Sequence, residues 1–472
     1  GSSKITGMAG KKNPDGSITI LAAASEDSTS YIRKGVVYSI DKTTQGLSNI
    51  ISKLKNSLQA DITQVYVGIG GQSIHSVKNM VIKDLPMDAI VSQNMVNELM
   101  DSNRNMTYPD YEIQDAITEE YKVDLQYQND PVGIQASRLE GNFLNILWRR
   151  SFYRNLNKSF DNAGIAIAET YLAPLVMADN VLTEAEKRAG CVLVDLGAET
   201  TTVSVYYRDK LRSIAVIPLG GDNITKDLES LQMEACEAER MKLKYSSAIT
   251  DVADIDPTAI LPIDSNRSVE SRRFIEVVEA RTLEIIENVK SFIPSEYIDK
   301  LLGGIIITGG GSNMTNIEKA FREITGVEKI RIAKFVTLNI NSKDSKPELR
   351  HDGTMNTILS LIARGDMNCA GNPFGNSLFD NQQFNAAFTT GTTNGTTTTQ
   401  PNATTPHETE EERTKREEKE RIAKEEAERI KQEEETRKAK EEEERKKNSP
   451  IHRFFGSLKQ FGRSLVEPEN NE

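Results

Sequence analysis

Residues 191–202, Cys-Val-Leu-Val-Asp-Leu-Gly-Ala-Glu-Thr-Thr-Thr, decide the fold. Cys191–Leu196 are apolar except for Asp195, and a run of this length and composition predicts a buried strand. The glycine that follows permits a tight turn, and the next apolar run, Val203–Tyr207, predicts the returning strand. A third strand is expected near Ile214–Ile217. The stretch therefore predicts a β-meander whose first turn follows a carboxylate.

The residues of that turn suit a metal–phosphate site. A carboxylate such as Asp195 at a strand end can hold Mg²⁺ directly or through water. Gly197 lets the backbone approach a phosphate, and the hydroxyls of Thr200 and Thr201 can donate to it. An acidic residue after a strand is also very often only a turn or helix cap, so the hairpin alone is a weak signal.

A second glycine turn follows another expected buried strand, Gly304–Thr308. The chain there runs through three glycines and a serine into a helix, and a glycine turn at a helix N-terminus is a place for a phosphate or the flat face of a base. A tight turn without a ligand is the more frequent meaning of such a run. The residues of this candidate site are Gly309, Gly310, Gly311 and Ser312.

The third candidate is the start of the chain, Gly1-Ser2-Ser3-Lys4, which opens a β-hairpin that returns at Ile18 after the turn Asn13–Gly16. Amphipathic helices are expected at Asn223–Tyr245 and Glu270–Ser291, which makes the class α/β. Two similar halves that each offer a phosphate hairpin to a shared cleft are the organisation of the actin-like ATPase fold. The order of the three turns therefore points to that fold more strongly than any one of them.

Composition excludes several classes of protein. A net charge of −12 over 472 residues argues against general nucleic-acid binding, which needs a basic surface. The sequence contains no apolar run of about 18 residues and no signal-peptide pattern, so neither a membrane span nor export is expected. The cysteines and histidines form no ligand pattern, and a reducing, cytoplasmic compartment fits their use. These residues are Cys191, Cys236, Cys369, His75, His351, His407 and His452.

The C-terminal third has the composition of a tether. Residues 366–407 are rich in Asn, Thr and Gly and are predicted to be a disordered, flexible linker. Residues 408–448 are almost entirely Glu, Lys and Arg with pairs at helical spacing, which favours one charged helical spacer. A coiled coil is the alternative, but apolar residues such as Ile422 and Ile430 are too few for its seam.

The last segment, 449–466, is predicted to be an amphipathic helix on a membrane surface. Ser449 can cap it, and Pro450 suits its first position. Steps of three and four place the apolar residues on one face, with basic residues beside it, as binding to anionic lipid requires. The residues predicted to contact the membrane are Ile451, Arg453, Phe454, Phe455, Leu458, Lys459, Phe461, Arg463 and Leu465. Docking on a protein partner is the alternative.

Several segments, in this order, resemble the FtsA family of bacterial division proteins. Gly1–Lys4 is similar to the end of the family's Asp-x-Gly-(Ser/Thr)-Ser-Lys loop, and Ile32–Val37 to its Arg-Lys-Gly-Val segment. Val65–Ile74 resembles the strand that opens the family's inserted subdomain. Ile217–Thr225 and Ala238–Lys242 resemble its Pro-x-Gly-Gly and Ala-Glu-x-x-Lys runs. The likeness covers nearly all of residues 1–365.

The resemblance implies an actin-like (ribonuclease H-like) two-lobed ATPase fold with an FtsA-type inserted subdomain, binding ATP and magnesium. It places Gly1, Ser2, Ser3 and Lys4 at the β- and γ-phosphates, Asp195 near the magnesium, and Gly197, Thr200 and Thr201 near the phosphates. It places Gly220, Gly221, Gly309, Gly310, Gly311 and Ser312 against the nucleotide, and Glu239 and Lys242 beside the ribose and purine. Arg272, Arg273 and Arg281 would bind the acidic C-terminal tail of the tubulin-like protein FtsZ, although a solvated helix face is the plainer interpretation of these arginines.

The domain boundaries follow from the same resemblance. The first lobe would comprise 1–64 (without its first strand) and 141–188, with the inserted subdomain at 65–140. The second lobe would comprise 189–222, a small FtsZ-binding subdomain at 223–300, and 301–365. The linker, spacer and membrane helix follow at 366–407, 408–448 and 449–466.

Two departures from the family pattern set the expected activity. The strand and Asp that precede the first loop in the family are not in this chain, so weak nucleotide binding is expected. Glu199 replaces a glycine of the Asp-x-Gly-Gly-Gly-Thr hairpin and adds negative charge where phosphates would lie. No residue suggests itself as a general base for water. At most slow ATPase activity is expected.

The function implied is that of a polymerising actin homologue that tethers the FtsZ ring to the cytoplasmic face of the inner membrane at the division site. It would contact itself, anionic lipid and other division proteins, but no nucleic acid. The alternative is an ATP-dependent small-molecule kinase or phosphatase of the same superfamily. A heat-shock 70 chaperone is disfavoured because no β-rich domain follows the core, and a pilus assembly protein because it lacks such a spacer and anchor.

Overall fold

The structure, a computed structural model, describes residues 1–256, 258–342 and 348–370. The predicted spacer (408–448), the amphipathic helix (449–466) and the linker after residue 370 lie outside the described residues. The chain described here is thus the predicted two-lobed body.

The second-lobe strands form as the sequence predicts. β11 (Cys191–Leu196) and β16 (Gly304–Thr308) have the predicted bounds and pair in parallel. β12 (Thr201–Tyr207) and β13 (Lys210–Ile217) complete the antiparallel meander. β17 (Ile330–Ile332) adds the far edge. The parallel pairing puts the ends of β11 and β16 side by side, which is where the two predicted glycine-containing turns begin.

One predicted helix was wrong. The expected continuous helix Asn223–Tyr245 is two helices, α6 (Gly221–Glu229) and α7 (Ala235–Tyr245). The chain turns between them because Gln232 takes a positive φ of 64°, and the Glu237 side chain caps the start of α7 by accepting from the Glu234 amide. The remaining second-lobe elements are α8 (Ser271–Ser291), α9 (Ser295–Ile298), α10 (Ile317–Thr325), the 3₁₀ turns η1 (Val252–Asp254) and η2 (Gly310–Asn313), and the hairpin β14 (Ile260–Pro262) and β15 (Ser268–Glu270).

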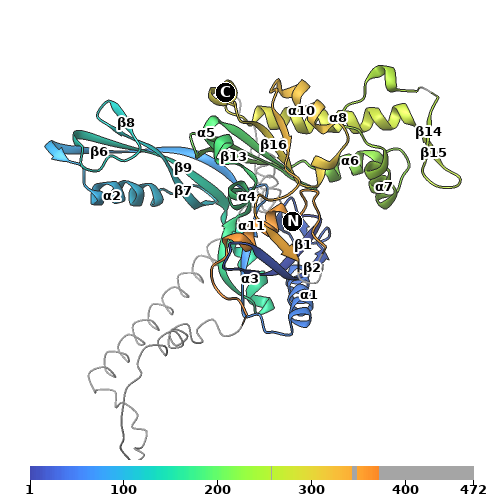
Figure 1. Cartoon of the computed structure of the whole chain (residues 1–472), viewed down its shortest axis with the longest axis horizontal. Helices are drawn as coiled ribbons and strands as arrows, with labels where there is room; N and C mark the ends of the chain where they lie inside the picture. The colour runs from blue at the N-terminus through green and yellow to red at the C-terminus, as the bar shows by residue number, and fades with distance from the viewer. Residues whose placement is uncertain (257, 343–347, 371–472) are drawn as a thin grey trace, which may run out of the picture. The chain divides into compact units, whose positions relative to one another are not determined.

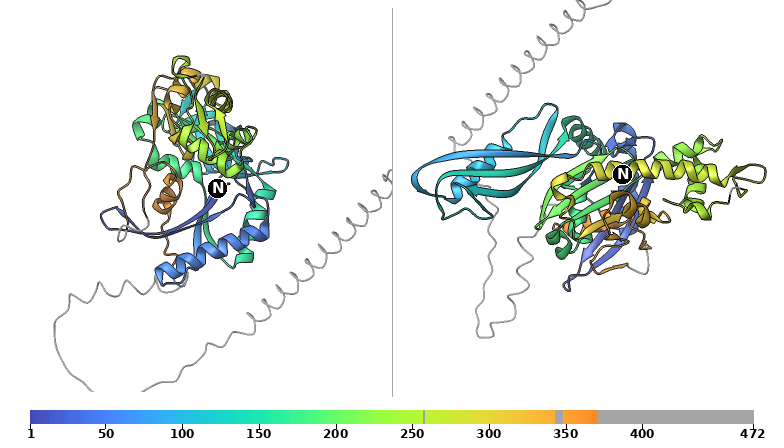
Figure 2. Two further views of the ribbon diagram at one scale, coloured as in Figure 1. Left: turned by 90° about the vertical axis from the view of Figure 1, so that its right-hand side faces the viewer. Right: turned by 90° about the horizontal axis from the view of Figure 1, so that it is seen from above.

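The first lobe is built around the predicted N-terminal hairpin. β1 (Lys4–Lys12) pairs with β2 (Ile18–Asp27), and α1 (Ile40–Leu58) packs on both (Figure 2). β18 (Ile340–Ser342) joins β2 in parallel, and α11 (Asn356–Arg364) packs on α4, so the chain returns to the first lobe after the second. The other elements of this lobe are β3 (Ile32–Arg33), β4 (Val36–Val37), β5 (Gln64–Ile69), α3 (Arg150–Ala163), β10 (Ala166–Leu172), α4 (Ala173–Val181) and α5 (Glu184–Ala189).

An inserted subdomain extends the second-lobe sheet. Its elements are β6 (His75–Ile90), α2 (Gln93–Arg104), β7 (Tyr111–Val123), β8 (Gln126–Gln128) and β9 (Gln135–Arg149). The strand order β17-β16-β11-β12-β13-β6-β9-β7-β8 makes one nine-stranded sheet across the junction. Figure 1 shows the insert on one side of the second-lobe strands and α6–α8 on the other. A buried ion pair between Arg212 and Glu119, 3.4 Å apart, ties β13 to β7 at this junction.

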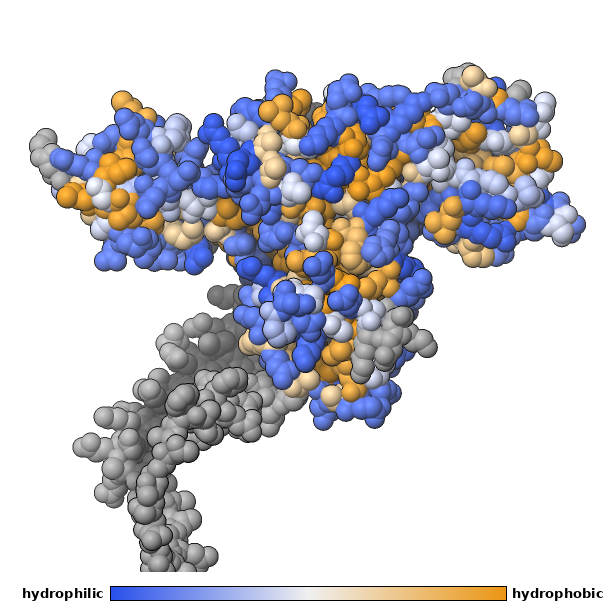
Figure 3. Space-filling model, in the orientation of Figure 1, coloured by the Kyte–Doolittle hydropathy of each residue, from blue (hydrophilic) through white to orange (hydrophobic). Residues whose placement is uncertain are grey.

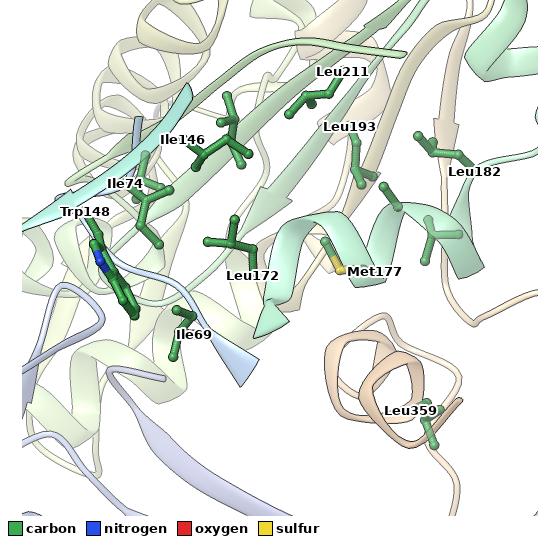
Figure 4. Close-up of a cluster of buried hydrophobic side chains, with 14 of the residues drawn as sticks. Ile69, Ile74, Ile146, Trp148, Leu172, Met177, Leu182, Leu193, Leu211 and Leu359 are labelled. Atoms are coloured by element: carbon green, nitrogen blue, oxygen red, sulfur yellow. The ribbon is translucent and has the colours of Figure 1, made fainter. Parts of the chain in front are cut away.

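The hydrophobic core reaches across both lobes because β11 has a buried residue on each face. Leu193 joins a cluster with Trp148, Met177 and Leu359 from first-lobe and insert elements (Figure 4), whereas Val194 joins a second cluster beneath α6–α8. Trp148 is 3% exposed and packs in the first of these clusters. The strand that carries Asp195 is therefore held rigidly from both sides.

Candidate functional site

The hairpin after β11 is closed by its own backbone. The Gly197 amide donates to the Thr200 carbonyl at 2.9 Å. Thr201 is fully buried, and its hydroxyl donates to the Leu219 carbonyl at 2.9 Å. This bond fixes the hairpin to the segment that enters α6, so the Thr201 donor is engaged inside the fold.

The start of α6 lies directly against this hairpin. The Gly221 amide donates to the Gly197 carbonyl at 3.0 Å, and the Asp222 amide donates to the Ala198 carbonyl at 2.7 Å. A Cβ atom at Gly220 would lie 2.5 Å from the Ala198 oxygen and 2.6 Å from the Gly197 oxygen. Only glycine therefore allows the helix start and the hairpin to touch.

The turn after β16 meets the same hairpin from the other side. Gly309 has a φ of +85°, and a Cβ atom there would clash with the Asp195 carboxylate and lie 2.6 Å from the Leu196 carbonyl oxygen. At Gly311 a Cβ atom would lie 2.8 Å from the Leu196 Cβ. Ser312 is buried, and its hydroxyl donates to the Gly309 carbonyl at 2.7 Å. The sequence predicted a helix directly after these glycines, but a 3₁₀ turn intervenes before α10.

Asp195 is the half-buried charge at this convergence. Burial raises the pKa of its carboxyl to about 6 from the ordinary 3.8. Within residues 1–256, 258–342 and 348–370, no salt bridge involves it, and no cluster of three or more acidic, histidine or cysteine side chains could hold a metal alone. A lone, uncompensated carboxylate beside a glycine-lined surface fits Mg²⁺, which is commonly held by one or two carboxylates together with waters and phosphate oxygens.

Lys242 braces the α6 start rather than projecting into solvent. It is 8% exposed, and its ammonium donates to the Gly221 carbonyl at 3.0 Å and the Thr225 hydroxyl at 2.8 Å. It also pairs with Glu239 at 2.6 Å. These three acceptors match its three donors, so Lys242 positions the α6 start. Direct contact of Lys242 and Glu239 with ribose or purine remains a prediction.

The N-terminal hairpin is held by side-chain hydroxyls. Ser28 is fully buried, and its hydroxyl lies 2.7 Å from the Gly1 carbonyl and 3.1 Å from the Ser2 carbonyl. Its amide donates to the Ser3 carbonyl at 3.2 Å. The Ser2 hydroxyl accepts from the Gly35 amide at 2.8 Å, while Lys4 begins β1 with an exposed side chain. Ser28 was missed in the sequence because its partners, Gly1 and Ser2, lie 27 and 26 residues before it in the chain.

Glu199 has partners that the sequence did not suggest. Its carboxylate accepts from the Lys34 amide at 2.6 Å and lies 3.5 Å from the Lys226 ammonium. Its charge, expected to repel phosphates, is therefore partly compensated within the chain.

The three arginines on α8 differ in how they are engaged. Arg281 pairs with Asp227 at 2.5 and 3.0 Å and with Glu284. Its guanidinium group is therefore already paired with carboxylates of this chain. Arg272 pairs with Glu276 at 2.9 Å on the helix surface. Arg273 is exposed. Partner binding by these residues remains a prediction.

Comparison with known proteins identifies the family. The family profile described as cell division protein FtsA matches residues 192–350, and that of the SHS2 domain inserted in FtsA matches residues 71–147. The cell division protein FtsA of Porphyromonas gingivalis is 31% identical over 72% of this chain and 73% of its own length. This chain belongs to the FtsA family. FtsA of Neisseria meningitidis is 30% identical over 71% of this chain and 86% of its own.

The fold comparison agrees with this assignment. A chain of the PilM–PilN type IV pilus biogenesis complex superposes with a TM-score of 0.53 at 14% identity, covering 77% of this chain and 96% of its own. The predicted actin-like fold with an FtsA-type insert is confirmed, as is the prediction of a cell-division actin homologue. The kinase or phosphatase alternative is not favoured. Among the residues that the structure describes, no helix is both long and apolar enough to cross a bilayer.

Proposed function

We propose that this FtsA-family chain binds ATP with Mg²⁺ at the convergence of the Asp195 hairpin, the α6 start and the glycine turn after β16. The observation that carries this is steric. A Cβ atom at Gly220 would collide with the hairpin backbone, one at Gly309 with the Asp195 carboxylate, and one at Gly311 with the Leu196 Cβ. Three chain segments thereby present their backbone to one place, which is what a phosphate group needs.

The residues around this proposed site would have different roles. Asp195 would hold Mg²⁺ directly or through water, and the metal would neutralise phosphate charge. The first amides of α6 donate to the Gly197 and Ala198 carbonyls, so this helix start would hold the Asp195 hairpin in place beside the phosphates. Lys242 keeps that helix start in place through the Gly221 carbonyl. With no general base assigned, turnover is slow and the nucleotide acts as a structural switch.

Isothermal titration of the full chain with ATP, with and without Mg²⁺, tests this site. Gly309→Ala should weaken binding at least tenfold, because its Cβ would displace Asp195. Gly133→Ala is the matched control, because Gly133 has the same φ of +85° but no atom within 4 Å of a Cβ atom. Asp195→Asn should lose the Mg²⁺ dependence even where Gly309→Ala folds poorly. Equal ATP affinity in all four proteins would overturn the proposal.

The proposed function includes attachment to membranes and to other division proteins. Residues 449–466 would fold on anionic lipid at the cytoplasmic face of the inner membrane, at the division site. One short helix binds reversibly, so a polymer with many copies would hold more firmly. Liposome co-sedimentation with and without residues 450–472 should show pelleting only with the segment and only with anionic lipid. Equal pelleting of both forms would contradict the anchor.

An exposed apolar patch on the insert supports self-assembly. Figure 3 shows apolar side chains gathered towards the free end of the insert. The exposed large apolar residues of the insert include Leu125, Tyr127, Met80 and Ile82, which are 86%, 61%, 54% and 42% exposed. Apolar surface exposed in this amount marks interaction sites. Leu125→Glu should reduce light scattering by assemblies of the full chain, whereas undiminished scattering would remove this patch from the polymer contact.

The remaining partner in the proposal is the FtsZ tail. Arg273 on α8 is exposed and can pair with a carboxylate of an acidic peptide. Fluorescence anisotropy with an FtsZ C-terminal peptide should show weaker binding by Arg273→Glu. Lys11→Glu, an exposed charge reversal on β1, is the control. Unchanged peptide affinity in Arg273→Glu would exclude this face.

A further inference from the structure

The turn that joins β3 to β4 donates hydrogen bonds to residues of both predicted phosphate hairpins. Lys34 and Gly35 both have positive φ values, 50° and 73°. Their successive amides donate to different lobes: Gly35 to the Ser2 hydroxyl at 2.8 Å, and Lys34 to the Glu199 carboxylate at 2.6 Å. Ser2 belongs to the first lobe, whereas Glu199 lies 165 residues after Lys34, in the second-lobe hairpin.

This turn is rigidly mounted. A Cβ atom at Gly35 would lie 2.7 Å from the Gly71 Cα and 2.8 Å from the Gly70 carbonyl oxygen. The Gln72 amide donates to the Lys34 carbonyl at 3.0 Å. The turn is thus locked to the segment that follows β5, so the Lys34 amide is a fixed donor on the first lobe.

Glu199 is equally constrained on its own lobe. Its side chain is 19% exposed, and the other carboxylate oxygen lies 3.5 Å from Lys226 on α6. The hairpin that carries it is bonded to the α6 start through Gly221 and Asp222. A movement of the second lobe away from the first would therefore break the Lys34–Glu199 bond.

We propose that Glu199 is an interlobe latch that holds the two lobes together before nucleotide binds. Its carboxylate joins the second-lobe hairpin to the first-lobe turn with a charge-assisted hydrogen bond, and Lys226 supports it. Lobe closure in this chain then depends less on nucleotide than it would with glycine at position 199. The latch uses only groups of this chain and does not rest on the proposed ATP site.

Amide hydrogen exchange in the nucleotide-free full chain tests the bond directly. Glu199→Ala should raise the exchange rate of the Lys34 amide about tenfold, because the acceptor is removed. Glu199→Gln keeps an acceptor but loses the pairing with Lys226, so a smaller rise of about threefold is expected. The Gly35 amide should not change, since its acceptor Ser2 lies on the same lobe. Equal Lys34 exchange in wild type and Glu199→Ala would overturn the proposal.

Spin-label distances test the effect on the lobes. Labels at Asp41→Cys in α1 and at the exposed Cys236 in α7, with Cys369→Ser, report the separation of the lobes. Without nucleotide, Glu199→Ala should broaden the distance distribution towards longer values, and Glu229→Ala, a control on exposed α6 surface, should not. An unchanged distribution in a folded Glu199→Ala protein would show that the bond exists without latching the lobes. Failure of ATP binding would leave both measurements interpretable, because neither uses nucleotide.

Discussion

The two predicted phosphate hairpins are held in place by different means. The N-terminal hairpin relies on hydroxyl groups, with Ser28 bonded to the carbonyls of Gly1 and Ser2. The Asp195 hairpin relies on the absence of side chains at Gly220 and Gly309, where backbone and carboxylate atoms occupy the space that a Cβ would need. A lost hydrogen bond can be partly replaced by water, whereas an added atom in a packed contact must displace the chain. The second hairpin should therefore be much less tolerant of substitution than the first.

The largest expected effect comes from placing a side chain in the second hairpin. Gly220→Val should destabilise the chain by about 3 kcal/mol, because overpacking forces the α6 start away from the Gly197 and Ala198 carbonyls. Urea unfolding would measure the change. Gly133→Ala, where nothing lies within 4 Å of a Cβ atom, should cost only about 1 kcal/mol through its positive φ. Equal costs at both sites would show that the contacts of a Cβ atom at Gly220 do not set the cost of substitution in the second hairpin.

The next effect concerns the charge in the second hairpin. Asp195→Asn should stabilise the nucleotide-free chain at pH 8 by about 2 kcal/mol, because burial raises the pKa of Asp195 from 3.8 to about 6. A raised carboxyl pKa means that the native state binds the proton more tightly than the unfolded state. The wild-type penalty is therefore absent below pH 3.8 and complete above about pH 6.

Unfolding at several pH values would check this prediction. The gain of Asp195→Asn over wild type should shrink as the pH falls from 6 towards 4, while ATP binding loses its Mg²⁺ dependence at every pH. A gain that is independent of pH would assign the effect to packing instead of charge.

A moderate effect is expected in the first hairpin. Ser28→Ala should cost about 1 kcal/mol, since it removes a buried donor shared by the Gly1 and Ser2 carbonyls. Hydrogen exchange should rise at residues 1–4 and stay unchanged at 195–201. Ser230→Ala, which removes an exposed hydroxyl after α6, is the control. A cost as large as that of Gly220→Val would contradict the tolerance expected of the first hairpin.

The smallest effects concern α8, where side-chain pairs differ in burial. Arg281→Ala should cost about 1 kcal/mol, because its two-atom pairing with Asp227 ties α8 to α6. Arg272→Ala should cost less than about 0.5 kcal/mol, since its pair with Glu276 is exposed. Thermal unfolding of both variants measures the difference, and the reverse order would show that Arg281 does not brace the helix carrying the site.

The sequence predicted those parts of the fold that depend on local pattern. Continuous apolar runs predicted β11 and β16 with their observed bounds, and glycine turns predicted where backbone would be presented. The break between α6 and α7 was missed because it depends on the positive φ of Gln232 and on a cap supplied by Glu237. The residue type gave no sign of this conformation, because a positive φ is expected mainly of Gly, Asn and Asp, and position 232 is a glutamine.

Contacts between segments that are distant in the chain could not be predicted from the sequence. Nothing in the local sequence indicates that Glu199 accepts a hydrogen bond from the Lys34 amide. Nor does it indicate that the Lys242 ammonium donates to acceptors on α6 and α7. The continuation of the second-lobe sheet into the insert rests on the bridge between Ala215 and His75, which only the packed structure brings together. The Asp195 hairpin, the α6 start and the glycine turn after β16 lie together because each follows a strand end or opens a helix, and sheet pairing fixes those places.

Hydrogen exchange of the full chain with and without ATP and Mg²⁺ tests the central claim most directly. The account predicts that nucleotide slows exchange in three separate segments together, residues 195–201, 219–225 and 308–314, and that omission of Mg²⁺ weakens this protection. Nucleotide that binds while protecting other segments, or that protects none of these three, would contradict it.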